Sequence, residues 1–305
     1  MIPKEWETYN GKNTRPADFD EFWDETITNI KNTKLSYQLI LQTKYDYYEK
    51  EVYRVELMAL DKTILIGWYI CTKKKQEYCL ITTHGYRSSK KSPHTYLYWL
   101  DSGVDVLVFD IRLQGGETSC NTPLTGPMNE VIALNFDDIK KSYLYMIYQD
   151  MCLISRLPSE LGYKGYILEG TSQAGGLAIA TGCLMQETKL VMANVPSNSD
   201  LDERINGKRG SFSAFQKICN HSDEMQKKVL TNLSYFDTKN MANRLRSPIF
   251  ASIGGLDDVC PGKAFMATYN RITAQKKLKY YPFSGHEGGA DMHQELEIAF
   301  LKRNL

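Results

Sequence analysis

Residues 166–180 read YILEGTSQAGGLAIA, and the fold can be worked out from this stretch outward. It begins as a short, mainly apolar run typical of a buried strand and ends as a helix of small residues. Ser172 lies at the junction, with Gly170 and Ala174 two positions away on either side. Small residues there permit a tight turn that exposes the serine hydroxyl above a sheet. The stretch predicts a nucleophilic serine; the alternative is an ordinary serine in a glycine-rich turn.

A nucleophilic serine needs a base, and the base needs a carboxylate, in the chain order serine, acid, histidine. Among the five histidines, only His286 follows a strand downstream of Ser172. That strand is expected at 277–281, and a glycine-rich loop at 282–289 follows it. We predict His286 as the base, the alternative being a loop histidine that caps a helix.

The acid is expected at the end of the preceding strand, which we place at 247–255. Asp257 and Asp258 both follow it, and the residues alone do not separate them. The alternative is that both are solvated loop aspartates. The order of the three groups after successive strands is more specific than any one of them.

An acyl-transfer site also needs donors for the oxyanion that forms on the substrate. The backbone N–H of Gln173, at the start of the helix, is one candidate. A strand expected at 77–83 is followed by His84-Gly85-Tyr86, so the N–H of Tyr86 is the second. We interpret His84 as a residue that shapes this loop.

With these motifs the chain resembles the acetyl xylan esterases and cephalosporin C deacetylases, which are carbohydrate esterases of the α/β-hydrolase fold. The resemblance extends over nearly the whole length. It includes residues 15–23 (RPADFDEFW), 67–68 (GW), 84–86 (HGY), 110–115 (DIRLQG), 170–173 (GTSQ), 233–237 (LSYFD) and 285–287 (GHE).

The resemblance implies roles for individual residues. Ser172 would be the nucleophile, His286 the base, and Tyr86 and Gln173 the oxyanion donors. The position of Cys260-Pro261 favours Asp257 as the acid. Pro196 and Val259 would form the walls of a small acyl pocket.

The sequence also departs from the pattern of that family. Leu113 occupies the glycine position of an Arg-Gly-Gln signature, where glycine could adopt a positive φ. Ala174 replaces the usual glycine after the serine. The stretch 116–133 is shorter than is usual. None of these changes removes a catalytic group.

Apolar strands alternate with amphipathic helices along the chain, which predicts a mostly parallel central sheet with helices on both faces. We expect the 305 residues to form a single α/β-hydrolase domain, 1–305. It would carry an N-terminal helical extension at about 14–33 and a small helical lid insertion at about 197–240. The extension should bury one face, formed by Phe19, Phe22, Trp23, Ile27 and Ile30.

The composition excludes several other classes of protein. A net charge of +1 gives no general attraction to nucleic acid or to an anionic membrane. Seven cysteines without a C-x-x-C pair argue against a disulfide framework and against zinc. We expect no cofactor and no metal. The first residues lack the apolar core of a signal peptide, so a cytoplasmic location is expected. Lys73–Lys75 are expected in a solvated hairpin turn.

The sequence therefore predicts a serine esterase that removes acetyl or other short acyl groups from a sugar, an oligosaccharide or a similar small alcohol. The family resemblance also implies a homo-oligomer. The alternatives are a thioesterase or peptidase on the same fold, or a hydrolase-fold protein that binds a ligand without turnover.

Overall fold

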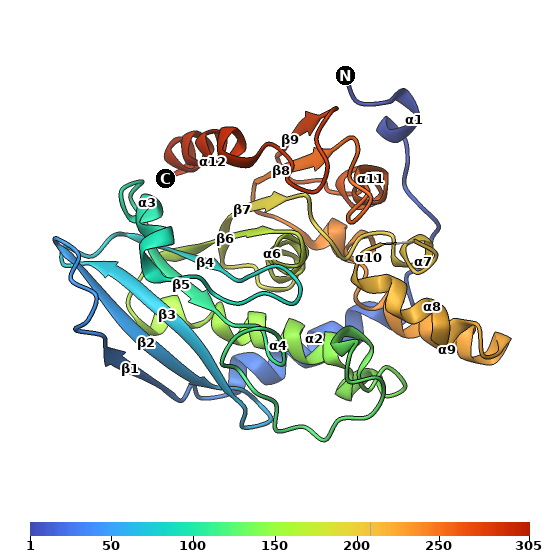
Figure 1. Cartoon of the computed structure of the whole chain (residues 1–305), viewed down its shortest axis with the longest axis horizontal. Helices are drawn as coiled ribbons and strands as arrows, with labels where there is room; N and C mark the ends of the chain where they lie inside the picture. Colours follow the sequence, from blue (N-terminus) through green and yellow to red (C-terminus); the bar gives the residue numbers. More distant parts are fainter. Residues whose placement is uncertain (208) are drawn as a thin grey trace.

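A nine-stranded sheet runs through the centre of the computed structural model, which describes residues 1–207 and 209–305 (Figure 1). The strand order is β1-β2-β3-β5-β4-β6-β7-β8-β9. The strands are β1 (Tyr37–Leu41), β2 (Lys50–Met58), β3 (Ile64–Thr72), β4 (Tyr78–Thr82), β5 (Asp105–Phe109), β6 (Gly165–Thr171), β7 (Thr188–Asn194), β8 (Ile249–Gly254) and β9 (Lys276–Tyr281).

The part of the sheet from β5 to β9 is parallel, whereas β1, β2 and β3 pair antiparallel with one another and β3 pairs antiparallel with β5. This confirms the predicted mostly parallel sheet. The predicted hairpin turn at Lys73–Lys75 is wrong, because β5 lies between β3 and β4. The two strands that flank these lysines both pair with β5 and not with each other.

Helices cover both faces of the sheet. On one face α3 and α12 pack against a cluster that contains Trp99, Val106 and Leu301; on the other, α2, α4 and α6 pack against the larger cluster (Figure 1). The helices are α1 (Lys4–Glu7), α2 (Phe19–Asn32), α3 (Leu97–Leu100), α4 (Tyr143–Ile154), α5 (Leu157–Glu160), α6 (Gln173–Leu184), α7 (Leu201–Arg204), α8 (Ala214–Cys219), α9 (Asp223–Ser234), α10 (Thr238–Met241), α11 (Gly262–Tyr269) and α12 (Ala290–Asn304). The five apolar residues expected on one face of the N-terminal helix are all buried on α2.

The segment expected to form a lid lies between β7 and β8 and contains α7, α8, α9 and part of α10. In Figure 1, α8 and α9 extend away from the sheet on the right. A buried ion pair lies within this segment, where Lys239 of α10 pairs with Asp200 at 2.7 Å. The function of this segment as a lid stays a prediction.

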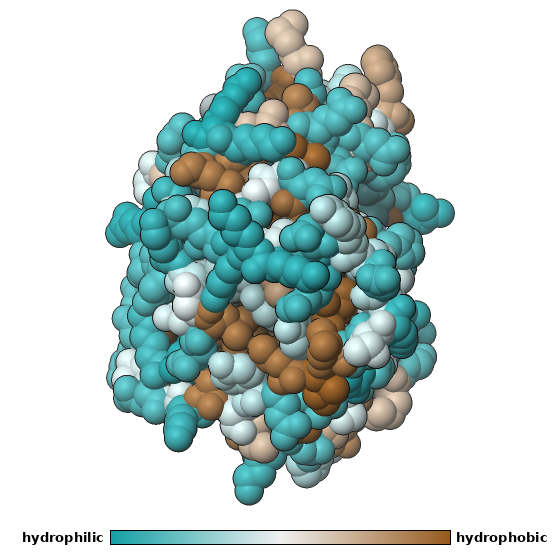
Figure 2. Space-filling view, turned by 90° about the vertical axis from the view of Figure 1, so that its left-hand side faces the viewer, coloured by the Kyte–Doolittle hydropathy of each residue, from teal (hydrophilic) through white to brown (hydrophobic). Residues whose placement is uncertain are grey.

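The face of the molecule that Figure 2 shows is mostly hydrophilic. Figure 2 shows the side of the molecule that faces left in Figure 1, where a band of apolar side chains interrupts the polar surface. The exposed large apolar residues of the chain include Ile40 and Leu41 on the edge strand β1, and Met58 at the end of β2.

His293 on α12 is a buried histidine, and its burial leads to a prediction of how stability depends on pH. Its Nδ1 lies 3.0 Å from the Tyr281 hydroxyl, and its ring contacts Phe250 at 4.9 Å between centroids. Burial, and secondarily the nearby Lys279 charge, lower the pKa of His293 to about 4. A histidine in the unfolded chain takes up its proton near pH 6.5. Between about pH 4 and pH 6.5 the unfolded state therefore binds more protons than the folded state.

We therefore expect the free energy of unfolding to fall by roughly 3 kcal/mol through this histidine as the pH drops from about 6.5 to about 4. Urea unfolding of the wild type and of His293→Phe across this range measures it. The variant should lose this part of the pH dependence while it keeps the part due to carboxylates. Equal slopes for the two proteins would contradict the prediction.

Candidate active site

The junction between β6 and α6 has the tight turn that the sequence predicted. Ser172 has φ 61° and ψ −120°, a backbone conformation that is uncommon for a residue with a side chain. A Cβ atom at Gly170 would lie 2.4 Å from the carbonyl carbon of Ala174 and 2.6 Å from its Cβ. Glycine at position 170 is therefore what allows Ala174 to be accommodated two residues after the serine.

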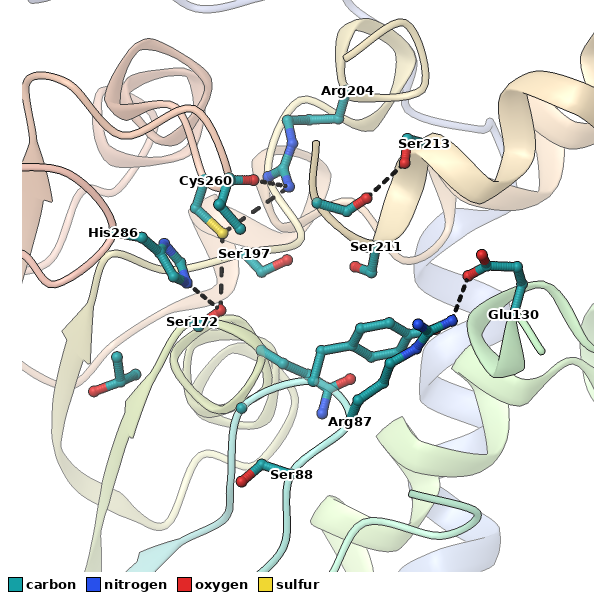
Figure 3. A pocket seen from close by; sticks show the side chains of 16 residues that line it. Arg87, Ser88, Glu130, Ser172, Ser197, Arg204, Ser211, Ser213, Cys260 and His286 are labelled. Atoms are coloured by element: carbon teal, nitrogen blue, oxygen red, sulfur yellow. Dashed lines mark hydrogen bonds and ion pairs between the residues drawn. The ribbon is translucent and has the colours of Figure 1, made fainter. Parts of the chain in front are cut away.

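Three distant side chains meet at this junction. Nε2 of His286 lies 2.9 Å from Oγ of Ser172 (Figure 3), and its Nδ1 lies 2.9 Å from Oδ2 of Asp257. The side chain of Asp257 is fully buried, and its Oδ1 accepts the N–H groups of Val259 and Cys260 at 2.9 and 2.8 Å. These bonds fix the carboxylate so that it orients the imidazole.

Asp258 points elsewhere. Its side chain is 62% exposed, and it forms a surface ion pair with Arg209 at 3.3 Å. The structure therefore brings Asp257 to His286 and leaves Asp258 in solvent, which separates two residues that the sequence alone left equivalent.

His84 is buried, and both of its ring nitrogens bind backbone. Nε2 accepts the N–H of Ile111 at 2.9 Å, which leaves Nδ1 to donate to the Gly85 carbonyl at 2.9 Å. Burial lowers the pKa of His84 and favours this neutral form. These contacts agree with the interpretation of His84 as a residue that shapes the loop.

The two candidate oxyanion donors, Tyr86 and Gln173, belong to the pocket that contains Ser172. Tyr86 follows β4, Gln173 begins α6, and both line the same pocket as Ser172. Among the hydrogen bonds of residues 1–207 and 209–305, neither backbone N–H has an acceptor. Both are therefore available for a ligand, which is the property an oxyanion donor requires.

Gln114 links the two donor segments, a contact that the sequence reasoning did not anticipate. Its Oε1 accepts the backbone N–H of Arg87 at 2.6 Å, and its Nε2 donates to Oε1 of Gln173 at 3.0 Å and to the Tyr143 hydroxyl at 2.8 Å. This amide ties the loop that carries Tyr86 to the start of α6. The signal was present in the Arg112–Gln114 motif, but its partners are distant in sequence.

Leu113 adopts the positive φ that the glycine of the motif would have taken, with φ 59°. Such a conformation costs a non-glycine residue about 1–2 kcal/mol. Its neighbours on both sides are held: Arg112 pairs with Asp61 and Asp150, each at 2.7 Å, and Gln114 is held as described above. The backbone conformation is thus preserved by these contacts despite the leucine.

The pocket above Ser172 has a volume of about 610 Å³, and both polar and apolar groups line it. Val259, predicted as an acyl-pocket wall, is part of this lining, whereas Pro196 is not and directly precedes the lining residue Ser197. The lining residues are Gly85, Tyr86, Arg87, Ser88, Glu130, Thr171, Ser172, Gln173, Ser197, Arg204, Gly210, Ser211, Ser213, Val259, Cys260 and His286. Sequence reasoning had not singled out Arg87, Glu130, Arg204 or Cys260 as pocket residues.

Within the described part of the chain, no group of three or more histidine, cysteine, aspartate or glutamate side chains is arranged to hold a metal ion. No helix that the structure describes has the length and apolar character needed to span a membrane.

The comparison with known families agrees with this geometry. The model of the acetyl xylan esterase (AXE1) family matches residues 1–304. The chain belongs to the acetyl xylan esterase family. This confirms the resemblance that the sequence motifs carried.

Individual relatives support the same assignment. Acetyl esterase Axe7A of Xylanibacter ruminicola is 23% identical over 288 residues, which is 89% of this chain and 63% of that protein. The chain thus spans less than two thirds of the length of this curated relative.

Two solved structures extend over the whole chain. Acetyl xylan esterase 1 from Thermoanaerobacterium sp. JW/SL YS485 has a TM-score of 0.91 at 25% identity and covers 99% of this chain and 98% of its own. An acetyl xylan esterase from Paenibacillus sp. R4 has a TM-score of 0.93 at 26% identity and covers both chains completely. The α/β-hydrolase fold is confirmed.

Proposed function

We propose that this protein is a serine esterase that removes acetyl and other short acyl groups from sugars or similar small alcohols. The observation that carries the proposal is the continuous hydrogen-bonded chain from Ser172 Oγ through His286 to Asp257. Such a chain lets a neutral imidazole withdraw the serine proton and holds the resulting imidazolium beside a carboxylate.

In the proposed reaction, Oγ of Ser172 attacks the ester carbonyl carbon while Nε2 of His286 takes its proton. The N–H groups of Tyr86 and Gln173 stabilise the oxyanion. The intermediate then expels the alcohol, which receives the proton from His286, and an acyl-serine remains. Water, activated by the same imidazole, attacks the acyl-serine, releases the carboxylic acid and restores the hydroxyl of Ser172.

The lining of the pocket supports a short acyl group and a polar alcohol. Ser88, Ser197, Ser211 and Ser213 present hydroxyl-bearing side chains, and Arg87, Glu130 and Arg204 present charges. A long alkyl chain would remove these groups from water without replacing their hydrogen bonds, which is costly. Sugar hydroxyls can replace those bonds.

A series of p-nitrophenyl esters from acetate to octanoate tests the proposal. We expect kcat/KM to be highest for acetate and to fall as the chain lengthens. Higher activity on octanoate would contradict the short-chain proposal. Turnover of thioesters or peptides in preference to oxygen esters would favour the other hydrolases of this fold, and absence of any turnover would favour a binding protein.

We also infer a cytoplasmic location and a homo-oligomeric state. The seven cysteines are all unpaired, which is consistent with a reducing compartment. The apolar band in Figure 2 is a surface that a second copy of the chain would cover in the oligomer. Sedimentation analysis tests the oligomer, since a monomer at micromolar concentration would contradict it. Fractionation of the source cells tests the location.

A further inference from the structure

Arg204 is a buried cation in the pocket that the proposed reaction does not use. It lies at the end of α7, is 5% exposed, and reaches toward Cys260 in Figure 3. Its Nη2 donates to the Val259 carbonyl at 2.8 Å and lies 4.0 Å from Sγ of Cys260. No partner for its Nε or Nη1 occurs among residues 1–207 and 209–305, so much of the five-donor capacity of this guanidinium is available.

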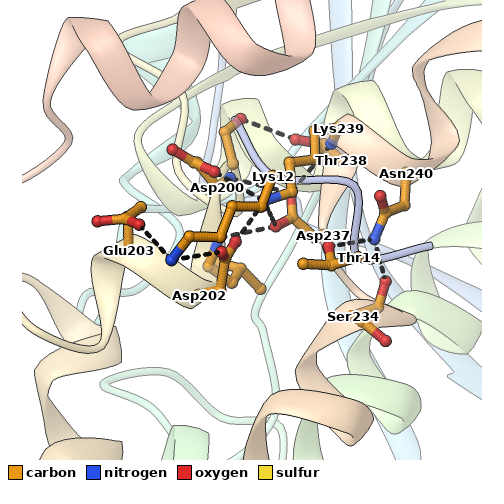
Figure 4. A network of polar contacts seen from close by, with 12 residues as sticks. Lys12, Thr14, Asp200, Asp202, Glu203, Ser234, Asp237, Thr238, Lys239 and Asn240 are labelled. Atoms are coloured by element: carbon orange, nitrogen blue, oxygen red, sulfur yellow. Dashed lines mark hydrogen bonds and ion pairs between the residues drawn. The ribbon is translucent and has the colours of Figure 1, made fainter. Parts of the chain in front are cut away.

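Among residues 1–207 and 209–305, the other buried lysine and arginine side chains are paired with carboxylates. Lys239 lies among three aspartates (Figure 4), which are Asp200, Asp202 and Asp237. Arg112 pairs with Asp61 and Asp150. Arg204 has no carboxylate within 4.0 Å in the part of the chain that the structure describes. A charge withdrawn from water without a counter-charge is unfavourable, and a ligand carboxylate would compensate it.

The remaining charges that line the pocket do not neutralise Arg204. Glu130, the one carboxylate among the lining residues, pairs with Arg87 at 3.1 Å. These two charges cancel each other and leave the positive charge of Arg204 in the pocket. The pocket is thus suited to an anion at the position of Arg204.

Arg204 is also close to the reacting serine. Sγ of Cys260 lies 4.0 Å from Nη2 of Arg204 and 3.9 Å from Oγ of Ser172, so one thiol separates the guanidinium from the nucleophile. A group bound by Arg204 would therefore belong to the same small molecule whose ester is attacked by Ser172. The planar guanidinium matches the geometry of a carboxylate.

We propose that Arg204 binds a carboxylate of the substrate that lies within a few bonds of the scissile ester. This inference rests on the proposed esterase function. Two kinds of ester carry such a group: acetylated sugar acids, with the carboxylate on the alcohol, and half-esters of dicarboxylic acids, with the carboxylate on the acyl group. In both, Arg204 also offsets the repulsion between the substrate carboxylate and the developing oxyanion.

Two pairs of substrates test the inference in wild type, Arg204→Met and the double variant Arg87→Met/Glu130→Gln. The first pair is methyl galacturonoside acetate and methyl galactoside acetate, and the second is p-nitrophenyl hemisuccinate and p-nitrophenyl butyrate. Arg204→Met should lower kcat/KM for the charged member of one pair by about 10- to 100-fold, and for its neutral partner by less than about threefold. The pair that responds identifies which side of the ester carries the carboxylate. Arg87→Met/Glu130→Gln removes a cation together with its paired carboxylate and leaves the net charge of the pocket unchanged, so the charged-to-neutral ratio should stay close to that of the wild type.

Equal losses on charged and neutral esters in Arg204→Met would overturn the inference, because Arg204 would then only support the loop at Val259 and Cys260. Should that variant fail to fold, inhibition of wild-type p-nitrophenyl acetate hydrolysis decides. Galacturonate should inhibit this hydrolysis more strongly than galactose does, and added salt should weaken the inhibition by galacturonate. Equal inhibition by the two sugars would overturn the inference. If the wild type hydrolyses no ester at all, the esterase proposal fails, and calorimetric binding of galacturonate still tests Arg204.

Discussion

Asp257→Asn is expected to lower kcat for p-nitrophenyl acetate by about four orders of magnitude, whereas Asp258→Asn should leave it within about threefold. The reason is the tautomer of His286. In the wild type, Asp257 Oδ2 accepts a proton from Nδ1, and Nε2 is left as the acceptor for the Ser172 hydroxyl. Oδ1 meanwhile accepts two backbone N–H groups.

An asparagine at 257 would keep its single oxygen on those two N–H groups and turn its NH₂ toward Nδ1. Nδ1 would then have to accept a hydrogen bond from this NH₂, so the ring proton would move to Nε2. With its proton on Nε2, the imidazole could no longer act as a base toward Ser172. Steady-state kinetics measure the loss, and circular dichroism checks that both variants fold. A large loss in Asp258→Asn with little change in Asp257→Asn would reverse the assignment of the acid.

The predictions from sequence succeeded where the chain order itself determines the contact. Ser172, Asp257 and His286 each follow a strand of the parallel region, and β6, β7, β8 and β9 are consecutive in the sheet. The carboxyl ends of parallel strands lie at one edge, so groups that follow these strands converge. This is why the strand-to-helix junction and the histidine could be identified without coordinates.

Other features depend on contacts between distant segments. The position of β5 between β3 and β4 is not encoded in the local pattern of either strand, and the hairpin expected at Lys73–Lys75 was wrong for that reason. The difference between Asp257 and Asp258 depends on which way each side chain leaves one short loop. Arg204 enters the pocket because the segment after β7 folds back over it, which no periodicity in that polar stretch predicts.

Replacing the nucleophile is expected to cause the largest loss of activity of any substitution considered. Two side chains compete for that role, because the thiol of Cys260 lies only 3.9 Å from the hydroxyl of Ser172. A thiolate is intrinsically the stronger nucleophile, so the assignment to serine has to be argued. Burial raises the pKa of the Cys260 thiol, which keeps it protonated at neutral pH. His286 hydrogen-bonds Ser172, and no hydrogen bond from a base to Cys260 occurs among the described residues.

Ser172→Ala is therefore expected to lower kcat by about six orders of magnitude, and Cys260→Ala by no more than about tenfold. A fluorophosphonate probe should label the wild type and Cys260→Ala but not Ser172→Ala. The reverse pattern, with labelling or acyl-enzyme formation lost only in Cys260→Ala, would make the thiol the nucleophile. Because Cys260 also lies against Arg204 at 4.0 Å, its removal should raise KM for charged esters more than for neutral ones, which separates a packing role from a chemical one.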